Sequence, residues 1–361
     1  MGWEMRVFRT SSGAEIYQLP LLAFPGLSGY AYLVFTGEYK VLIDAGSGIG
    51  EANRHLEEGF GEVSKILDQE GRAPGAGFSF ADLTHILITH GHIDHIGGLV
   101  HIRPLTNAKI GVHELDNRIL TNYEERLVVV ARRLSQYLVE AGVPPDLQAE
   151  LFSMYRMAKA LFRSIPTDFT YEAQGMRLGP FEMLHVPGHC AGHVVIRLED
   201  VLFSGDHILE DTSPHQAPEH LTLSTGLDHY LKSLDAVEAW AKGVSLTLGG
   251  HKEPIDDLPR RIQEIRELHR ERLDKVLELL EQPKTIYEIS EALFGEVHGY
   301  NKLLAVEEAG AHVEYLYQRG QLEIANLSEY EKGDRPPKIL YQCAECRTNR
   351  SKQGSTGSNL F

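Results

Sequence analysis

This sequence is short of cysteine and lacks both long apolar runs and an apolar leading segment. Its three cysteines are an odd number in a chain of 361 residues, which argues against a disulfide framework. No stretch approaches the roughly 18 apolar residues of a membrane span, and the segment from Met1 to Thr10 carries no apolar core like that of a signal peptide. We therefore expect a soluble cytoplasmic protein with no membrane partner.

The sequence also has fewer basic than acidic residues. The sequence has 35 basic and 51 acidic residues, which gives a formal net charge of −16. Such an excess opposes nonspecific attraction to nucleic acid, so we do not expect a nucleic-acid partner. The apolar fraction of 42% is ordinary for a globular protein, and the length allows two domains or one large domain with an appendage.

Histidine is abundant, with 18 residues, and three histidines and an aspartate lie within one six-residue segment. These residues are His90, His92, Asp94 and His95. They follow an apolar run, 83–89, that predicts a short buried strand, and they precede the pair Gly97-Gly98. A spacing of two keeps His90 and His92 on one face of an extended chain, whereas Asp94 and His95 point elsewhere once the chain turns. The segment therefore predicts two neighbouring metal ions, with zinc, iron or manganese as candidates; a polar loop with surface histidines is the alternative.

The same pattern of an apolar strand, a glycine and a possible ligand recurs three times. Strands expected over 181–186, 200–204 and 244–248 are followed by His189, Asp206 and His251. Glycine lets the backbone turn tightly and approach a site closely. Because sites in α/β proteins are commonly built on the loops after strands, we expect these residues and the His90–His95 segment to converge on one metal centre.

Two further polar residues follow predicted strands. Asp44 ends the strand expected over 39–44, which forms a hairpin with 30–36 through Gly37-Glu38. Asp44 is our candidate for orienting a metal ligand by a hydrogen bond, and a cap of the following turn is the alternative. His113 follows the strand at 109–112, and we expect a structural role for it.

Helical periodicity over 123–141 and 146–164 predicts a helical insertion, 114–166, between strands. It is either a lid over the metal site or a packing or dimerisation hairpin, so a homodimer is left open. If it is a lid, Tyr155, Arg156 and Arg163 are candidates for binding an acidic group of the substrate.

The region after 255 reads as a separate module. Helices are expected over 256–282, 285–294 and 302–319, followed by a strand at 321–325, an order that is winged-helix-like. Its last helix is acidic, which favours packing or dimerisation over nucleic-acid binding. The tail, 333–361, is expected to be flexible, and Cys343 with Cys346 makes only half of a zinc or redox site. The predicted domains are 1–255, 256–332 and the tail.

The motif Thr-His-x-His-x-Asp-His, with the later Pro-Gly-His, Gly-Asp and Gly-His, resembles the metallo-β-lactamase fold superfamily of metallohydrolases over residues 13–255. The resemblance implies an α/β fold, a four-layer αββα sandwich. It implies one metal held by His90, His92 and His189, a second held by Asp94, His95 and His251, and Asp206 bridging the two ions. The appendage looks like that of the lactamase-like 2 branch, which includes ribonucleases, and the Pro-Gly-His motif also looks like glyoxalase II-type thioesterases.

Three positions depart from these patterns. Aspartate, not cysteine, stands at the bridging position, unlike in true zinc β-lactamases. Cys190 stands where threonine is common, and His251 lies in Gly-Gly-His-Lys rather than Pro-Gly-His-Gly.

The expected function is hydrolysis of a small ester or thioester by a hydroxide that bridges two divalent ions, most simply Zn²⁺. Asp94 would orient the nucleophile. The alternatives are a phosphodiesterase or ribonuclease of the same fold, a di-iron redox protein, and a binding protein that keeps the metal fold without turnover.

Overall fold

The computed structural model describes residues 4–72, 77–160, 162–332 and 337–344. The chain divides into two units. The first, which we call the sandwich unit, comprises Met1–Leu127, Lys159–Pro214 and His229–Glu264. The second, which we call the helical unit, comprises Val128–Ala158, His215–Asp228 and Ile265–Phe361.

The sandwich unit is built on two sheets. The first has seven strands in sequence order, and the second has five in the order β12-β11-β10-β9-β8. The strands of the first sheet are β1 (Arg6–Arg9), β2 (Glu15–Phe24), β3 (Leu27–Thr36), β4 (Tyr39–Ile43), β5 (His85–Leu87), β6 (Lys109–Val112) and β7 (Phe169–Thr170). Those of the second are β8 (Arg177–Leu178), β9 (Phe181–His185), β10 (Val194–Leu198), β11 (Val201–Gly205) and β12 (Leu246–Gly249).

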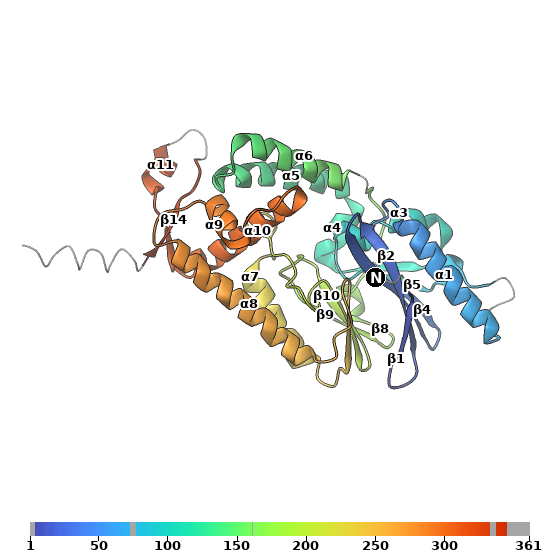
Figure 1. Cartoon of the computed structure of the whole chain (residues 1–361). Coiled ribbons are helices and arrows are strands. Elements are labelled where there is room, and N and C mark those ends of the chain that lie inside the picture. Colours follow the sequence, from blue (N-terminus) through green and yellow to red (C-terminus); the bar gives the residue numbers. More distant parts are fainter. Residues whose placement is uncertain (1–3, 73–76, 161, 333–336, 345–361) are drawn as a thin grey trace, which may run out of the picture. The chain divides into compact units, whose positions relative to one another are not determined.

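Alternation along the strands separates two apolar cores. In β4, Val41 and Ile43 pack with residues of the second sheet, whereas Leu42 packs on the other side with residues of helix α1 (Ala52–Gln69). Helix α1 thus covers the outer face of the first sheet (Figure 1). Helix α7 (Leu227–Trp240) is tied to the second sheet, since Arg197 Nη1 of β10 donates to Trp240 O at 3.3 Å. The predicted αββα order is confirmed.

The strand predictions hold with one exception. β3 and β4 form the predicted hairpin, with Thr36 paired to Tyr39 across the two-residue turn. From the sequence, the segment 15–19 reads as a short strand that Pro20 ends, but β2 continues through Pro20 and pairs it with Tyr30. Proline is tolerated here because β1 pairs only with Glu15–Gln18, so that, among the described residues, no strand of the sheet lies on that edge of β2 at Pro20.

The predicted helical insertion lies in both units. The helices involved are α4 (Glu114–Thr121), α5 (Tyr123–Glu140) and α6 (Pro145–Lys159). From Val128 to Ala158 the chain groups with the C-terminal helices, unlike the predicted division at residue 255. The physical reason is visible at Tyr137, whose buried hydroxyl donates to Val306 O at 2.8 Å.

The remainder of the helical unit follows the predicted helix order. Its elements are α8 (Leu258–Leu279, which begins in the sandwich unit), α9 (Ile286–Phe294), α10 (Tyr300–Gln318), β13 (Leu322–Ile324), α11 (Leu327–Lys332) and β14 (Tyr341–Cys343). Residues 337–344 had been assigned to a flexible tail, yet Tyr341–Cys343 pairs antiparallel with β13. Cys346, the partner of Cys343 in the sequence motif, lies outside the described residues. None of the described helices is both long and apolar enough to cross a bilayer.

Candidate metal centre

The predicted ligands all follow strands of the sandwich unit, but they come from both sheets. His90 and His92 lie in the turn after β5, and His92 begins the short helix α2 (Ile93–Ile96) that carries Asp94 and His95. His189 follows β9, Asp206 follows β11, and His251 follows β12. The ends of strands in the two facing sheets thus deliver one set of side chains.

These seven side chains form two adjoining groups. One consists of His90, His92 and His189, and the other of Asp94, His95, Asp206 and His251. Within each group, one donor atom from every residue lies within 4.8 Å of the others. The tertiary structure therefore brings together every residue that the sequence motif proposed as a ligand.

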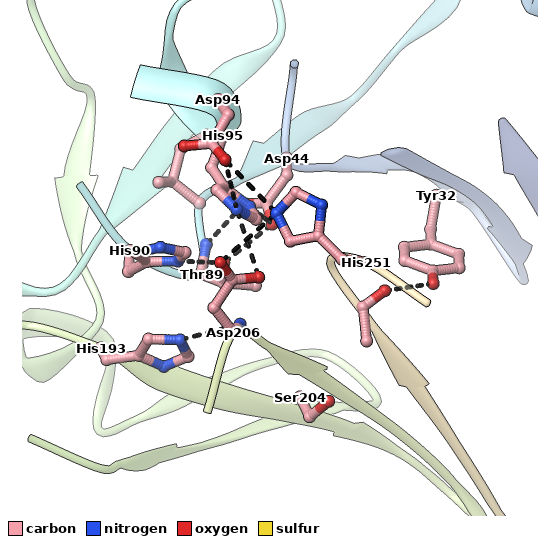
Figure 2. A network of polar contacts seen from close by, with 12 residues as sticks. Tyr32, Asp44, Thr89, His90, Asp94, His95, His193, Ser204, Asp206 and His251 are labelled. Atoms are coloured by element: carbon pink, nitrogen blue, oxygen red, sulfur yellow. Dashed lines mark hydrogen bonds and ion pairs between the residues drawn. The ribbon is translucent and has the colours of Figure 1, made fainter. Parts of the chain in front are cut away.

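Asp206 belongs to the second group, where Figure 2 shows it beside His95 and His251, and it also lies near the first group. Its Oδ2 is 3.4 Å from His251 Nε2 and 3.9 Å from His189 Nε2, and its Oδ1 is 3.4 Å from His95 Nε2. A carboxylate placed in this way could contribute to cation binding by either group.

The donor atoms suit a metal. His90 Nε2 and Asp206 Oδ1 are buried, and no hydrogen bond from the described part of the chain satisfies either atom. Buried polar atoms normally have a partner, so a bound cation is the simplest explanation for such a set. The combination of imidazole nitrogens and carboxylate oxygens fits a divalent metal ion, with His90, His92 and His189 as one set of holders and Asp94, His95, Asp206 and His251 as the other.

Electrostatics distinguishes the two groups. Burial, with the neighbouring imidazoles, lowers the pKa of His90 and His92 well below the usual value, which keeps both in the neutral form that binds metals. In the other group, burial opposes the charged form of His251, yet Asp206 and Asp94 raise its pKa to about 10. The carboxylates there create a field that favours positive charge.

Asp44 contacts one of the candidate ligands, His95. Its Oδ2 lies 2.8 Å from His95 Nδ1, and it also accepts the Thr89 hydroxyl at 2.8 Å, while Oδ1 accepts Thr89 N at 2.8 Å (Figure 2). His95 donates from Nδ1 and so presents Nε2 to Asp206. On the other side, His251 Nδ1 donates to Ser28 O at 2.6 Å.

The Gly97-Gly98 pair fixes the position of this segment. A Cβ on Gly97 would lie 1.8 Å from Ser47 O, and one on Gly98 would lie 2.0 Å from Ala45 O. The end of α2 can therefore pack directly on the loop that follows Asp44, and Gly98 N donates to Gly46 O at 2.9 Å.

The sequence reasoning missed Asp116. This fully buried carboxylate accepts Gly91 N and Gly192 N, each at 2.8 Å, and lies 3.2 Å from Cys190 Sγ. Gly91 lies between His90 and His92, and Gly192 lies just past His189, so Asp116 links the two loops that carry the three-histidine group. The sequence pattern could have identified Asp116, because this residue follows the strand at 109–112 in the same way that the candidate ligands follow their strands.

His193 was also missed. Its ring stacks on that of His90, with centroids 4.5 Å apart, and its Nε2 accepts Asp206 N at 3.1 Å (Figure 2). His113 is structural, as expected, since its Nδ1 accepts Leu115 N at the start of α4 at 3.2 Å.

The three proposed substrate residues do not lie in one unit. Tyr155 is buried and Arg156 is exposed, both on α6 in the helical unit, whereas Arg163 is exposed in the sandwich unit. Their role in binding an acidic group stays a prediction.

Comparison with known proteins gives consistent matches. The profile of the family described as Metallo-beta-lactamase superfamily matches residues 24–281. The chain is 28% identical over 294 residues to the probable metallo-hydrolase YqjP of Bacillus subtilis, covering 79% of this chain and 86% of that protein. It is 22% identical over 310 residues to the beta-lactamase-like protein 2 homolog of Drosophila melanogaster, covering 83% and 86%.

Two solved structures extend these matches to the fold. A metallo-beta-lactamase family protein from Thermus thermophilus aligns over 91% of this chain and 98% of its own, with a TM-score of 0.71 and 26% identity. A beta-lactamase domain protein from Burkholderia ambifaria aligns over 95% of this chain and 92% of its own, with a TM-score of 0.61 and 20% identity.

Proposed function

The chain belongs to the metallo-beta-lactamase superfamily, and from this premise we propose that it is a binuclear metallohydrolase that cleaves a small ester or thioester. The single observation that carries the proposal is the position of Asp206, within 3.9 Å of donor atoms in both groups. The Bacillus subtilis relative bears the name of a probable metallo-hydrolase, which agrees with hydrolysis as the reaction class.

The chain's own residues have separate tasks in this scheme. His90, His92 and His189 would hold one ion, Asp94, His95 and His251 would hold the other, and Asp206, which lies near donors of both groups, would contribute to both. When bound, two such ions supply a hydroxide near neutral pH and polarise the scissile carbonyl. Zn²⁺ is the ion we propose, because neutral imidazole and carboxylate are among its usual ligands.

Asp94 is the proposed catalytic carboxylate. Burial opposes its ionisation, but the neighbouring charges of His95 and His251 hold its pKa below the usual range, so it stays an acceptor. Its Oδ2 lies 3.3 Å from His251 Nε2, within the group that contains Asp206. From there it can accept a hydrogen bond from the attacking nucleophile and fix its orientation.

The net charge of the protein favours a small substrate over RNA. A formal net charge of −16 opposes the approach of polyanionic RNA, which disfavours the ribonuclease alternative.

The test is thiol release from a panel of acyl-glutathione and acyl-CoA thioesters, run beside cleavage of a short RNA. Zinc-loaded protein is compared with its Asp94→Ala variant and with Asp256→Ala, which removes an exposed carboxylate. We expect thioester turnover that Asp94→Ala lowers by at least about 100-fold and Asp256→Ala leaves unchanged. RNA cleavage alone would replace the proposal with the nuclease alternative, and turnover of neither substrate by the metal-loaded protein would contradict the proposal.

A further inference from the structure

A second cluster of metal-binding side chains lies in the helical unit, outside the centre described above. His269 of α8 meets Glu308 and His312 of α10, and one donor atom from each lies within 4.8 Å of the others. Both histidines are 0% exposed and Glu308 is 6% exposed. Side chains of this polarity are rarely buried without a specific partner.

The distance between the imidazoles fits a shared cation. His269 Nδ1 lies 3.1 Å from His312 Nε2. Two nitrogens bound to one tetrahedral zinc at about 2.0–2.1 Å are separated by roughly 3.3 Å, so only a small movement would place an ion between these atoms.

The orientation of His312 also matches that of a ligand. Its Nδ1 lies 2.8 Å from Glu308 O, one helical turn earlier, and donates to that carbonyl. The proton is thereby fixed on Nδ1, and Nε2 is left to present its lone pair toward His269. A metal-bound histidine is typically oriented in this way, by a backbone or carboxylate acceptor on its other nitrogen.

The charges around the cluster include more carboxylate than cation. Arg272 Nη1 lies 2.8 Å from Glu308 Oε1, while Glu308 Oε2 accepts Gln216 N at 2.6 Å. The neighbouring Glu307 is also buried, with its Oε2 3.3 Å from His215 Nε2. Arg272 is thus paired with one of two neighbouring buried glutamates, and each oxygen of Glu308 keeps a lone pair beyond the hydrogen bond it accepts.

The simpler alternative is a hydrogen-bonded histidine pair without a metal. In that case His269 donates a proton from Nδ1 to His312 Nε2, and the cluster serves only to join α8 to α10. Burial, with the neighbouring His312 imidazole, lowers the pKa of His269, and burial lowers that of His312 to about 4. Both imidazoles are therefore neutral, a state that serves the hydrogen bond and metal binding equally.

We propose that His269, Glu308 and His312 bind a divalent transition-metal ion, zinc by the chemistry of its ligands, and that this ion joins α8 to α10. The site is separate from the proposed hydrolytic centre, and its role is structural. Because such an ion binds the folded helical unit and not the unfolded chain, it adds to the stability of that unit.

The experiment uses the full chain carrying His92→Ala and Asp206→Ala, which disable the hydrolytic centre. This background protein is reconstituted with Zn²⁺ or Co²⁺ and freed of excess metal. Metal content is measured, and the visible absorption of bound Co²⁺ reports on the ligands. We expect about one equivalent of metal to remain and to be lost when His269→Ala and His312→Ala are added, with affinity at least about tenfold weaker.

Two controls keep the result interpretable. His298→Ala removes a histidine of the helical unit whose side chain is 81% exposed, and it should retain the metal. Glu308→Gln, similar in size, serves as a second variant if the double histidine variant does not fold. A background protein that retains no metal overturns the proposal, and so does equal retention by a folded cluster variant. Neither result depends on whether the chain is a hydrolase.

Discussion

Asp44 Oδ2 lies 2.8 Å from His95 Nδ1, and this contact fixes the ring of a metal-centre histidine from the side opposite Asp206. Asp44 itself has a positive φ of 58°, a conformation that aspartate and asparagine tolerate better than most residues. The backbone conformation of Asp44, just after β4, thus places its carboxylate next to His95.

Asp44→Asn should weaken metal binding by roughly 10–100-fold, because it removes the charge behind His95 while suiting the same backbone conformation. Competition titration against a coloured chelator measures the change. The control is Asp256→Asn, at an exposed position. Equal affinities in the two variants would show that Asp44 acts only as a turn cap.

Asp206→Ala should reduce the metal content of both groups, since its carboxylate lies near donors of each. His92→Ala removes a ligand of the three-histidine group alone. Both variants should lose metal and activity together, as measured by metal analysis and the thioester assay. If both kept full activity, the binuclear assignment would be wrong.

Asp116→Ala should lower both stability and retention of metal by the three-histidine group. It leaves the buried Gly91 and Gly192 amides without their acceptor, at a cost of about 1–3 kcal/mol for each. Chemical denaturation and metal analysis would measure the two effects. Cys190→Ser is the matched control, because it keeps a donor beside Asp116 and should change little.

Gly97→Ala should prevent α2 from packing, because its Cβ would lie 1.8 Å from Ser47 O, a backbone atom. We expect loss of metal and a large fall in melting temperature. Gly61→Ala, in the middle of α1, is the opposite case. Apart from the neighbouring helix backbone, no atom of the described residues lies within 4 Å of the added Cβ. The substitution should therefore stabilise the fold by about 0.5–1 kcal/mol. Similar effects of the two substitutions would contradict this account.

His85→Phe should make the protein less sensitive to acid. The His85 ring lies 5.8 Å from that of Tyr39 and 6.1 Å from that of Phe169, and burial, with the charge of Lys109, lowers its pKa. The unfolded chain therefore binds a proton near pH ~6.5 that the folded protein resists, so this contribution to stability is present above that pH and lost below it.

The measurement for His85→Phe is the free energy of unfolding from about pH 7 to about pH 5. It should fall less steeply in the variant than in the parent. A variant with an equal slope would mean that His85 takes up its proton in the folded state.

Sequence alone was sufficient to select the side chains that the structure brings together in the candidate metal centre, because each follows an apolar strand near a glycine or a turn. The His90–His95 segment, His189, Asp206 and His251 all follow this rule, and Asp44 follows it too. The hairpin at Gly37-Glu38 and the helix expected over 285–294 were equally predictable, since they depend on local turn chemistry and periodicity.

Only the tertiary structure decided which residues far apart in the chain come into contact. The distances of Asp206 to both groups, the link made by Asp116, and the meeting of His269 with His312 depend on how strands and helices pack, which no local pattern encodes. The same holds for Tyr137, whose bond to Val306 unites the middle of the chain with its C-terminal helices. Local sequence specifies which residues stand at the ends of strands and helices, whereas long-range packing selects which of those ends meet.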